Sequence, residues 1–140
     1  EGDHHFRFSL TSHPGGWTNA WRRGLDPNMP LIAVVDPDRA DRADLPESRS
    51  FFALSAANGL ITTVKKCADD DSLIVRFVEI EGRTAETEVR SSFPLARAEA
   101  VDILEQNPRP LPFDGNGLKT RLGHHAIETI KLHPAGKARD

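Results

Sequence analysis

The sequence has a single cysteine, no tyrosine, no excess of positive charge and no long apolar run. Because Cys67 has no possible partner within the chain, no internal disulfide can form, and nothing indicates an oxidising compartment. The formal net charge of −3 excludes the broad basic surface that nucleic-acid binding needs. The apolar stretches are far shorter than a bilayer span. We therefore expect no nucleic-acid partner and no membrane association.

The length of 140 residues is typical of one domain. A compact domain of this size buries roughly two-thirds of its unfolded surface, so it can form a core without disulfides or metals. The chain begins Glu-Gly-Asp, without methionine, and enters a strand-like pattern at once, whereas natural N-termini are usually less ordered. We therefore expect it to be part of a longer polypeptide. Because signal sequence, disulfide and Asn-x-Ser/Thr site are all absent, we expect a bacterial cytoplasmic protein.

Short β-rich runs separated by turn signals extend along most of the chain. No long run has the 3.6-residue period of a helix, and the one helical candidate is residues 16–23. Many short strands with turn residues between them predict an all-β, antiparallel β-sandwich with little or no helix. The predicted strands are residues 4–10, 31–35, 50–54, 60–67, 73–80, 84–91, 98–104, 118–122 and 127–132.

The clearest local structure is a hairpin within residues 58–82. Two runs rich in Val, Ile, Thr and Phe flank an acidic tip, residues 69–71, whose aspartates have low β-propensity. The second run, residues 73–80, is largely apolar on both faces and should lie in the middle of the domain. The next run, residues 84–91, alternates charged and small or apolar residues, so we expect one of its faces to lie in water.

Two segments have no evident place in a core. Residues 36–49 mix acids and arginines with almost no apolar side chains, which predicts a mobile, solvated loop. Residues 135–140 offer nothing to pack, which predicts a frayed tail. We therefore assign residues 1–134 to the sandwich domain.

Three patches of the sequence are similar to a known family. The first is HHFRFSLTSHPGGW at residues 4–17, and the second is the hairpin, with Asn58, Arg76, Glu79 and Gly82 in the familiar order. The third combines DILE at 102–105 with AIETIKL at 126–132, where Ala126 replaces the usual glutamate. Together they resemble the C-terminal β-sandwich of the α-mannosidases of glycoside hydrolase family 38.

The resemblance implies a supporting domain of a larger enzyme. It implies an accessory fold of the galactose-mutarotase-like, supersandwich type, and an N-terminal catalytic domain in the same polypeptide as partner. The parent would hydrolyse terminal α-linked mannose with retention, and it would hold zinc in its catalytic domain. No motif of this chain matches the family's nucleophile or zinc ligands, so we expect no catalytic residue, no metal site and no cofactor here. The domain would contact α-mannosides through its parent and could help the enzyme to form homo-oligomers.

Other chemistry is weakly indicated. The pairs His4-His5 and His124-His125 have no H-E-x-x-H or C-x-x-C spacing, and neighbouring side chains there are not expected to converge. The acids of residues 36–38 lack the glycine of an EF-hand loop, and the acidic tip reads better as a solvated turn. Glu79 and Glu81 lie on one strand face, but an exposed strand end with charged neighbours is the favoured interpretation. Cys67 has no adjacent base.

The tryptophans are the best candidates for a contact surface. Trp17 and Trp21 lie four residues apart near His13 and could stack on sugar rings. They could equally bury apolar area against the rest of the enzyme, which we favour because large aromatic residues are enriched at interfaces. We predict His13, Trp17 and Trp21 as a carbohydrate or domain-interface site.

Two alternatives remain open at this point. A free-standing carbohydrate-binding module would place exposed aromatic residues along one sheet face, and the absence of tyrosine argues against such a platform. A plain interaction domain of immunoglobulin-like architecture is the other, since the missing Cys…Trp…Cys arrangement excludes only its disulfide-bearing version.

Overall fold

The computed structural model describes residues 2–6, 8–35 and 46–136. The chain divides into two compact units, Glu1–Asp44 and Leu45–Asp140, which we treat separately. Most of the loop predicted at residues 36–49 and most of the tail predicted at residues 135–140 lie outside the described residues. Assignment of residues 1–134 to a single sandwich domain stays a prediction.

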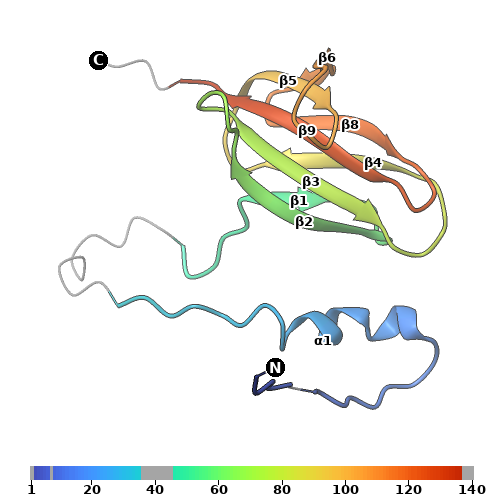
Figure 1. Cartoon of the computed structure of the whole chain (residues 1–140). Helices are drawn as coiled ribbons and strands as arrows, with labels where there is room; N and C mark the ends of the chain where they lie inside the picture. The colour runs from blue at the N-terminus through green and yellow to red at the C-terminus, as the bar shows by residue number, and fades with distance from the viewer. Residues whose placement is uncertain (1, 7, 36–45, 137–140) are drawn as a thin grey trace. The chain divides into compact units, whose positions relative to one another are not determined.

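The second unit is built from two antiparallel sheets (Figure 1). One has the strand order β1-β4-β8-β7 and the other β2-β3-β9-β5-β6, so the chain crosses between sheets after β1, β3, β4, β6 and β8. The prediction of an antiparallel β-sandwich with little helix is confirmed. The strands are β1 (Phe52–Leu54), β2 (Gly59–Lys66), β3 (Leu73–Glu79), β4 (Ala85–Ser91), β5 (Leu95–Val101), β6 (Arg109–Pro110), β7 (Phe113–Asp114), β8 (Gly117–Leu122) and β9 (Ile127–Pro134).

The predicted hairpin forms β2 and β3. The two strands pair antiparallel from Gly59 opposite Glu79 to Lys66 opposite Leu73, with a register shift between Ile61 and Thr63. The other edge of β3 pairs with β9, so β3 has a hydrogen-bonded neighbour on each side. The interior position predicted for this strand from its two apolar faces is therefore confirmed.

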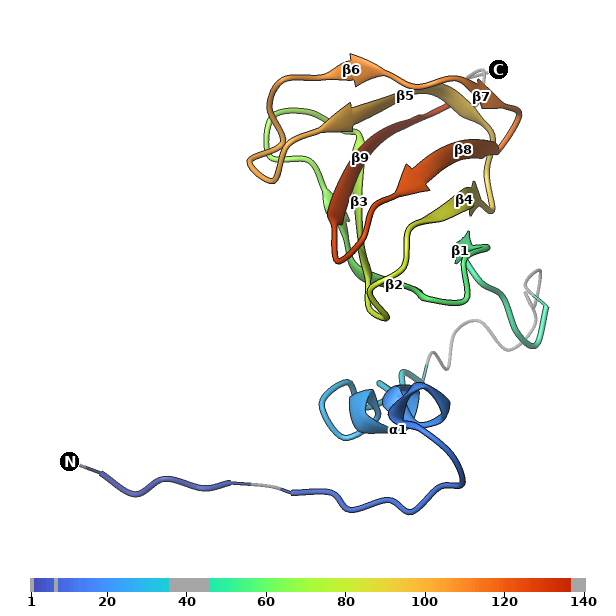
Figure 2. The same cartoon turned by 90° about the vertical axis from the view of Figure 1, so that its right-hand side faces the viewer.

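The core lies between the two sheets, which face each other as layers in the rotated view (Figure 2). Side chains from both sheets interdigitate there, because alternate residues of each strand point inward. Phe77 of β3 is the largest fully buried side chain. The other buried members of the cluster are Val75, Val89, Leu95, Ala98, Leu118, Leu122, Ile130 and Leu132.

The outward face of the β4 sheet is charged. Thr87, Val89 and Ser91 of β4 are buried, whereas Glu86 and Arg90 are exposed. The alternation therefore places one face of β4 in water, as predicted.

The strand predicted at residues 98–104 is displaced: β5 covers Leu95–Val101 instead. The chain leaves the sheet at Asp102, whose carboxylate accepts hydrogen bonds from the backbone N–H groups of Leu104 and Gln106, both at 2.9 Å. Such local bonds offer the backbone an alternative to the sheet ladder, so a turn forms despite the β-propensity of Ile103 and Leu104. Glu105 then adopts a positive φ of 67°.

The first unit contains little regular structure. The helix predicted at residues 16–23 is present as two short pieces, a 3-10 turn at Trp17–Asn19 and α1 (Trp21–Leu25). Strands predicted at residues 4–10 and 31–35 are wrong for the described residues, which form no strand. A strand requires a partner for its backbone, and neither segment has one here. Within the described ranges, no helix has the length and apolar content to cross a bilayer.

Candidate functional site

A buried carboxylate, Glu79, joins three separate parts of the sandwich at one end. Glu79 is the last residue of β3 and is 1% exposed. Its Oε1 accepts hydrogen bonds from Asn58 Nδ2 at 2.8 Å and the Glu81 N–H at 2.7 Å. Its Oε2 accepts from the Gly82 N–H at 2.8 Å and the His125 N–H at 2.9 Å. We call these five residues the Glu79 anchor.

The Glu79 anchor depends on the order of the strands. Asn58 directly precedes β2, Glu81 and Gly82 form the turn from β3 to β4, and His125 lies in the turn from β8 to β9. Since β3 lies between β2 and β9, the three segments meet around the end of β3. Asn58 also donates to the Arg83 carbonyl at 2.7 Å, which fastens the same turn a second time. The carboxylate therefore satisfies backbone donors that strand pairing leaves free.

The hydrogen bonds keep Glu79 ionised. Burial alone raises the pKa of a carboxyl group, because it disfavours the charged form. Here the hydrogen bonds from the backbone of His125 and Glu81 and from the Asn58 amide outweigh burial, and they lower the pKa of Glu79 to about 2. With both oxygens occupied by donors, this carboxylate is neither a nucleophile nor a proton donor. The Glu79 carboxylate therefore has a structural role.

The expectation that Glu79 is an exposed strand end with charged neighbours is therefore wrong. Strand alternation places Glu79 on the inward face with Val75 and Phe77, and the hydrogen-bond donors come from loops that alternation does not describe. A signal did exist in the sequence. Asn58, Glu79 and Gly82 stand in the order that the family resemblance includes, and Gly82 adopts a φ of +76°, which favours glycine.

We expect the sandwich to lose stability in acid through the Glu79 anchor. The pKa of Glu79 is lower in the folded chain than its ordinary value of 4.5, so this group stabilises the fold above that value. The contribution is lost as the pH falls towards 2. The difference in melting temperature between the wild type and Glu79→Gln should therefore shrink between pH 7 and pH 3. Thermal denaturation at a series of pH values tests this, and an unchanged difference would contradict it.

The acidic tip is a turn, but part of it is ion-paired. Asp70 accepts a hydrogen bond from the Ser72 N–H at 2.9 Å and lies 2.8 Å from Lys131 Nζ of β9, whose side chain is only 12% exposed. The Lys131 ammonium and the Ser72 hydroxyl and N–H hold the pKa of Asp70 well below its ordinary value. On the same hairpin, Lys65 Nζ lies 2.6 Å from Glu105 Oε1. These pairs attach the hairpin tip to its neighbours.

Arg76 connects the outward face of β3 to the turn after β5. Its Nε donates to Thr129 Oγ1 of β9 at 3.1 Å, and its Nη2 donates to the Ile103 carbonyl at 2.9 Å. Its donors are thus spread over two partners from different elements. Arg76 therefore acts as a structural contact between β3, β9 and the turn after β5.

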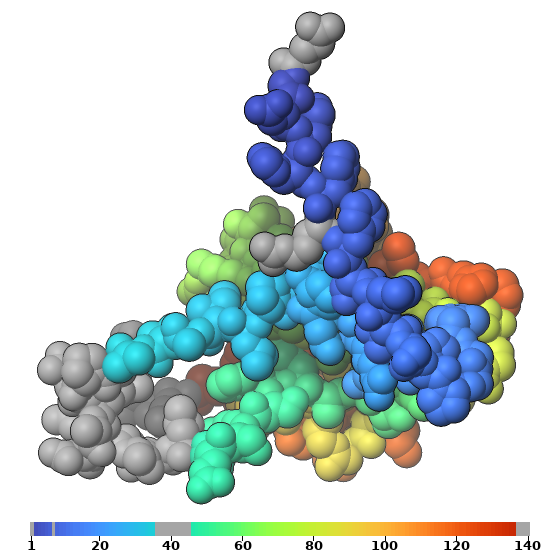
Figure 3. Space-filling model, turned by 90° about the horizontal axis from the view of Figure 1, so that it is seen from below, coloured from blue at the N-terminus to red at the C-terminus, as the bar shows by residue number. Residues whose placement is uncertain are grey.

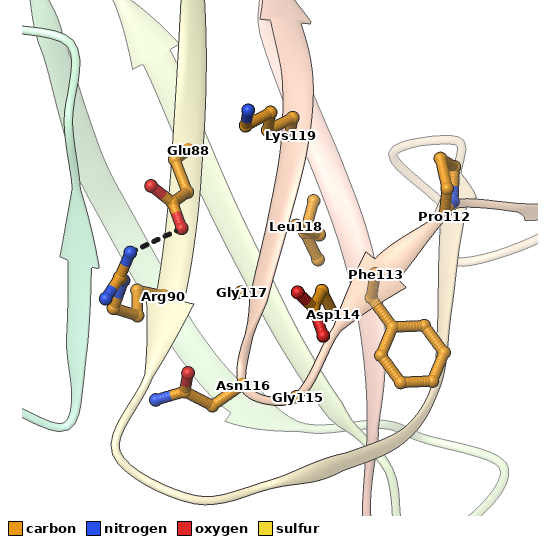
Figure 4. A pocket seen from close by; sticks show the side chains of 10 residues that line it. All are labelled: Glu88, Arg90, Pro112, Phe113, Asp114, Gly115, Asn116, Gly117, Leu118 and Lys119. Atoms are coloured by element: carbon orange, nitrogen blue, oxygen red, sulfur yellow. Dashed lines mark hydrogen bonds and ion pairs between the residues drawn. The ribbon is translucent and has the colours of Figure 1, made fainter.

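An open cleft of about 640 Å³ lies beside the β7–β8 turn (Figure 4). Its lining includes Glu88 and Arg90 of β4, which form an ion pair at 2.7 Å, and Lys119 of β8. Gly117 leaves room for the Glu88 carboxylate, because a Cβ there would lie 2.7 Å from Oε1. The charged side chains that line the cleft can form hydrogen bonds with polar groups of a ligand. Its aromatic lining residue, Phe113, is 38% exposed and lies in the edge strand β7.

The structure does not gather the three predicted contact residues into one site. His13 is half-buried and lines a shallow hollow of about 410 Å³ in the first unit, whereas neither tryptophan is among the lining residues. Trp17 is exposed in the 3-10 turn, and Trp21 is half-buried in α1 with the Arg22 guanidinium 4.7 Å from the centre of its ring. A carbohydrate or interface role for His13, Trp17 and Trp21 stays a prediction.

The side chains of His124 and His125 were not expected to converge, but they lie in contact. The rings of His124 and His125 meet edge to face, with centroids 4.4 Å apart, in a turn where His125 has a positive φ of 50°. Both rings approach Gly82. For the residues that the structure describes, no group of three histidine, cysteine, aspartate or glutamate side chains is placed to hold a metal ion.

Comparison with known proteins agrees with the fold. Residues 58–130 match the profile of the glycosyl hydrolases family 38 C-terminal beta sandwich domain, a range that begins at Asn58 and includes Glu79, Gly82 and His125. The chain is also 28% identical over 139 residues to alpha-mannosidase 2C1 of Mus musculus. This similarity covers 94% of the chain but only 13% of the mouse protein. The chain belongs to glycosyl hydrolase family 38, whose C-terminal β-sandwich domain it contains.

Proposed function

We propose that this chain is a non-catalytic C-terminal domain of an α-mannosidase, and that it supports the catalytic domain of the same polypeptide. The observation that carries the proposal is the match of residues 58–130 to the family's C-terminal sandwich, together with an α-mannosidase as a relative. The Glu79 anchor is consistent with this role. It engages its carboxylate in four hydrogen bonds that hold turns together and leaves no oxygen lone pair directed at a substrate.

The parent reaction is hydrolysis of terminal α-linked mannose with retention of configuration. Retention requires a nucleophilic carboxylate and a second carboxyl group that acts as acid and then as base, both flanking the scissile bond. The family resemblance adds a zinc ion. The described residues of this chain do not provide a zinc site, since no suitable group of three ligands exists among them. We place the zinc, the nucleophile and the contacts to α-mannosides in the catalytic part of the parent, because no motif of this chain matches the family's nucleophile or zinc ligands.

The support is architectural. A rigid sandwich can hold loops of a neighbouring domain in place through a fixed surface, and it can also provide a surface for homo-oligomer formation. We further propose that the parent is a bacterial cytoplasmic enzyme, because the chain has a single cysteine and no Asn-x-Ser/Thr site.

The structure gives little to favour the alternatives. A carbohydrate-binding module needs aromatic side chains along one sheet face, but the outward residues of β4 and β8 are charged: Glu86, Glu88, Arg90, Lys119 and Arg121. Phe113 lies at the edge of the open cleft and is only partly exposed. An immunoglobulin-like interaction domain would share the sandwich architecture, but the family match argues for the mannosidase domain.

The test compares three proteins in the hydrolysis of a chromogenic α-mannoside. They are this chain alone, the longer polypeptide that contains it, and that polypeptide without residues 45–140. We expect no turnover by the chain, chelator-sensitive turnover by the longer polypeptide, and loss of turnover when the sandwich is removed. Glu86→Ala in the longer polypeptide is the control for a harmless change within the sandwich. It should keep full turnover, because Glu86 is exposed and outside the Glu79 anchor.

Each alternative result has a distinct meaning. Turnover by this chain alone would overturn the proposal that it is non-catalytic. Full turnover without residues 45–140 would overturn the supporting role. If the longer polypeptide were inactive on α-mannosides, the mannosidase proposal would fail while the sandwich fold would stand.

A further inference from the structure

The first unit exposes more apolar surface than a free surface normally carries. Phe6, Phe8 and Leu10 are 77–101% exposed, and residues 31–35 include four large apolar side chains that are 84–101% exposed. In the space-filling view, the N-terminal part of this unit is a narrow, extended segment (Figure 3). Exposed apolar surface of this extent marks an interaction site. We call these two stretches the apolar segments.

Among the residues that the structure describes, the backbone of the apolar segments is also unpaired. No backbone–backbone hydrogen bond between described residues involves a residue of the range 2–14, and none involves a residue of the range 30–35. Backbone N–H and C=O groups that become buried must find partners. Any surface that covers these side chains must therefore also bond the backbone. A sheet edge meets both demands at once, because an added strand gains main-chain hydrogen bonds and places alternate side chains in pockets.

The two apolar segments differ in pattern, and the difference predicts how each is covered. In the first, Phe6, Phe8 and Leu10 alternate with the polar His5 and Ser9, which is typical of a strand with one covered face. In the second, residues 31–35 read Leu-Ile-Ala-Val-Val and are apolar on both faces. That pattern is typical of a strand covered on both sides.

We propose that the apolar segments add as β-strands to a sheet in the catalytic part of the same polypeptide. This inference rests on the proposed function. The partner is a sheet edge whose faces bury Phe6, Phe8 and Leu10 on one side only and residues 31–35 on both sides. The segments thus attach the sandwich to the catalytic part, while the first unit by itself leaves them open to solvent.

The reach of the sequence similarity favours this occupant over a second copy of the chain. Because the match to the mouse α-mannosidase covers 94% of the chain, it cannot be confined to Leu45–Asp140 and must extend well into the first unit. The match is only 13% of that protein, so the relative holds the corresponding region within a far longer polypeptide. In a longer polypeptide of that kind the partner can lie within the same chain, whereas a second copy would have to be recruited from solution.

Hydrogen–deuterium exchange on the longer polypeptide tests the proposal. We expect the amides of residues 8–10 and 31–35 to exchange at least about 100-fold more slowly than in an unstructured chain, as strands in a sheet do. In the same protein, Phe8→Lys should abolish this protection of residues 8–10, whereas Ser9→Lys, the matched control on the opposite face, should retain it. Val34→Lys and Val35→Lys should both abolish protection of residues 31–35.

The outcomes separate this inference from the proposed function, because α-mannoside hydrolysis is measured on the same sample. Rapid exchange of both segments in an active mannosidase would overturn the strand addition and leave the function standing. Slow exchange of both segments in a protein without mannosidase activity would support the strand addition and overturn the proposed function. Protection that disappears on dilution would identify a second copy as the occupant and would overturn the assignment to the catalytic part. Equal effects of Phe8→Lys and Ser9→Lys would contradict the one-sided strand.

Discussion

Replacing Glu79 by alanine is expected to lower the melting temperature of the sandwich by more than about 10 °C at pH 7. The alanine would leave the backbone N–H groups of Glu81, Gly82 and His125 and the amide of the buried Asn58 without the carboxylate oxygens that they now contact at 2.7–2.9 Å. An orphaned buried donor costs more than an ordinary hydrogen bond contributes, because it has lost its water as well as its partner. Thermal denaturation followed by circular dichroism measures the effect.

Glu86→Ala is the matched control for this substitution. Glu86 is a glutamate of the neighbouring strand β4, but it lies on the outward face and is exposed. Exposed substitutions of this kind usually change stability little, so the melting temperature should move by less than about 3 °C. Similar shifts for the two variants would show that the Glu79 anchor does not hold the three turns together. Asn58→Ala should lower the melting temperature less than Glu79→Ala but more than Glu86→Ala, since it removes one of the four hydrogen bonds and the second contact to Arg83.

The strands were predictable where local chemistry and packing agree. Residues 58–82 form the hairpin β2–β3 as expected, because β-branched and aromatic runs flank a tip whose aspartates favour a turn. The apolar residues on both faces of β3 correctly predicted a strand with neighbours on both sides. The family could also be recognised from the residues themselves, and the match of residues 58–130 confirms it.

The two short strands show the limit of pattern reading. β6 and β7 contain two residues each, Arg109–Pro110 and Phe113–Asp114, so neither can show an alternation. They exist because β5 and β8 offer free edges to pair with. The displacement of β5 has a different cause: the carboxylate of Asp102 captures nearby N–H groups and ends the strand earlier than side-chain propensity suggests.

The Glu79 anchor could not be predicted from periodicity. Glu79 and His125 are 46 residues apart, and they meet only because β9 pairs with β3. Alternation gives the face on which a side chain lies but not which loops surround it. The family-like order of Asn58, Glu79 and Gly82 was the available sequence signal, but it does not reveal that the carboxylate is buried.

The first unit was misread for a related reason. The alternation of Phe6, Phe8 and Leu10 predicts a strand, and the described residues form none. Sequence pattern records which side chains need cover, whereas a strand exists only when another strand pairs with its backbone. The pattern and the structure agree if the partner belongs to another part of the polypeptide, which is the inference that hydrogen exchange tests.

The second large effect is expected at the centre of the core. Phe77 of β3 is fully buried among residues of both sheets. Its replacement by alanine removes a large apolar side chain and leaves a cavity that β-sheet backbone cannot collapse to fill. We expect Phe77→Ala to reduce the free energy of unfolding by about 3–5 kcal/mol, which is a large part of the stability of a domain of this size. Urea denaturation measures the change.

Val64→Ala separates loss of packing from loss of β-propensity. Val64 lies in β2, the strand next to β3, but its side chain is 49% exposed. Shortening it opens no enclosed cavity, so the loss should stay below about 1 kcal/mol. If Phe77→Ala cost no more than Val64→Ala, the two sheets would not share a close-packed core around Phe77. Phe77→Leu should fall between them, because leucine refills part of the volume while keeping the interior apolar.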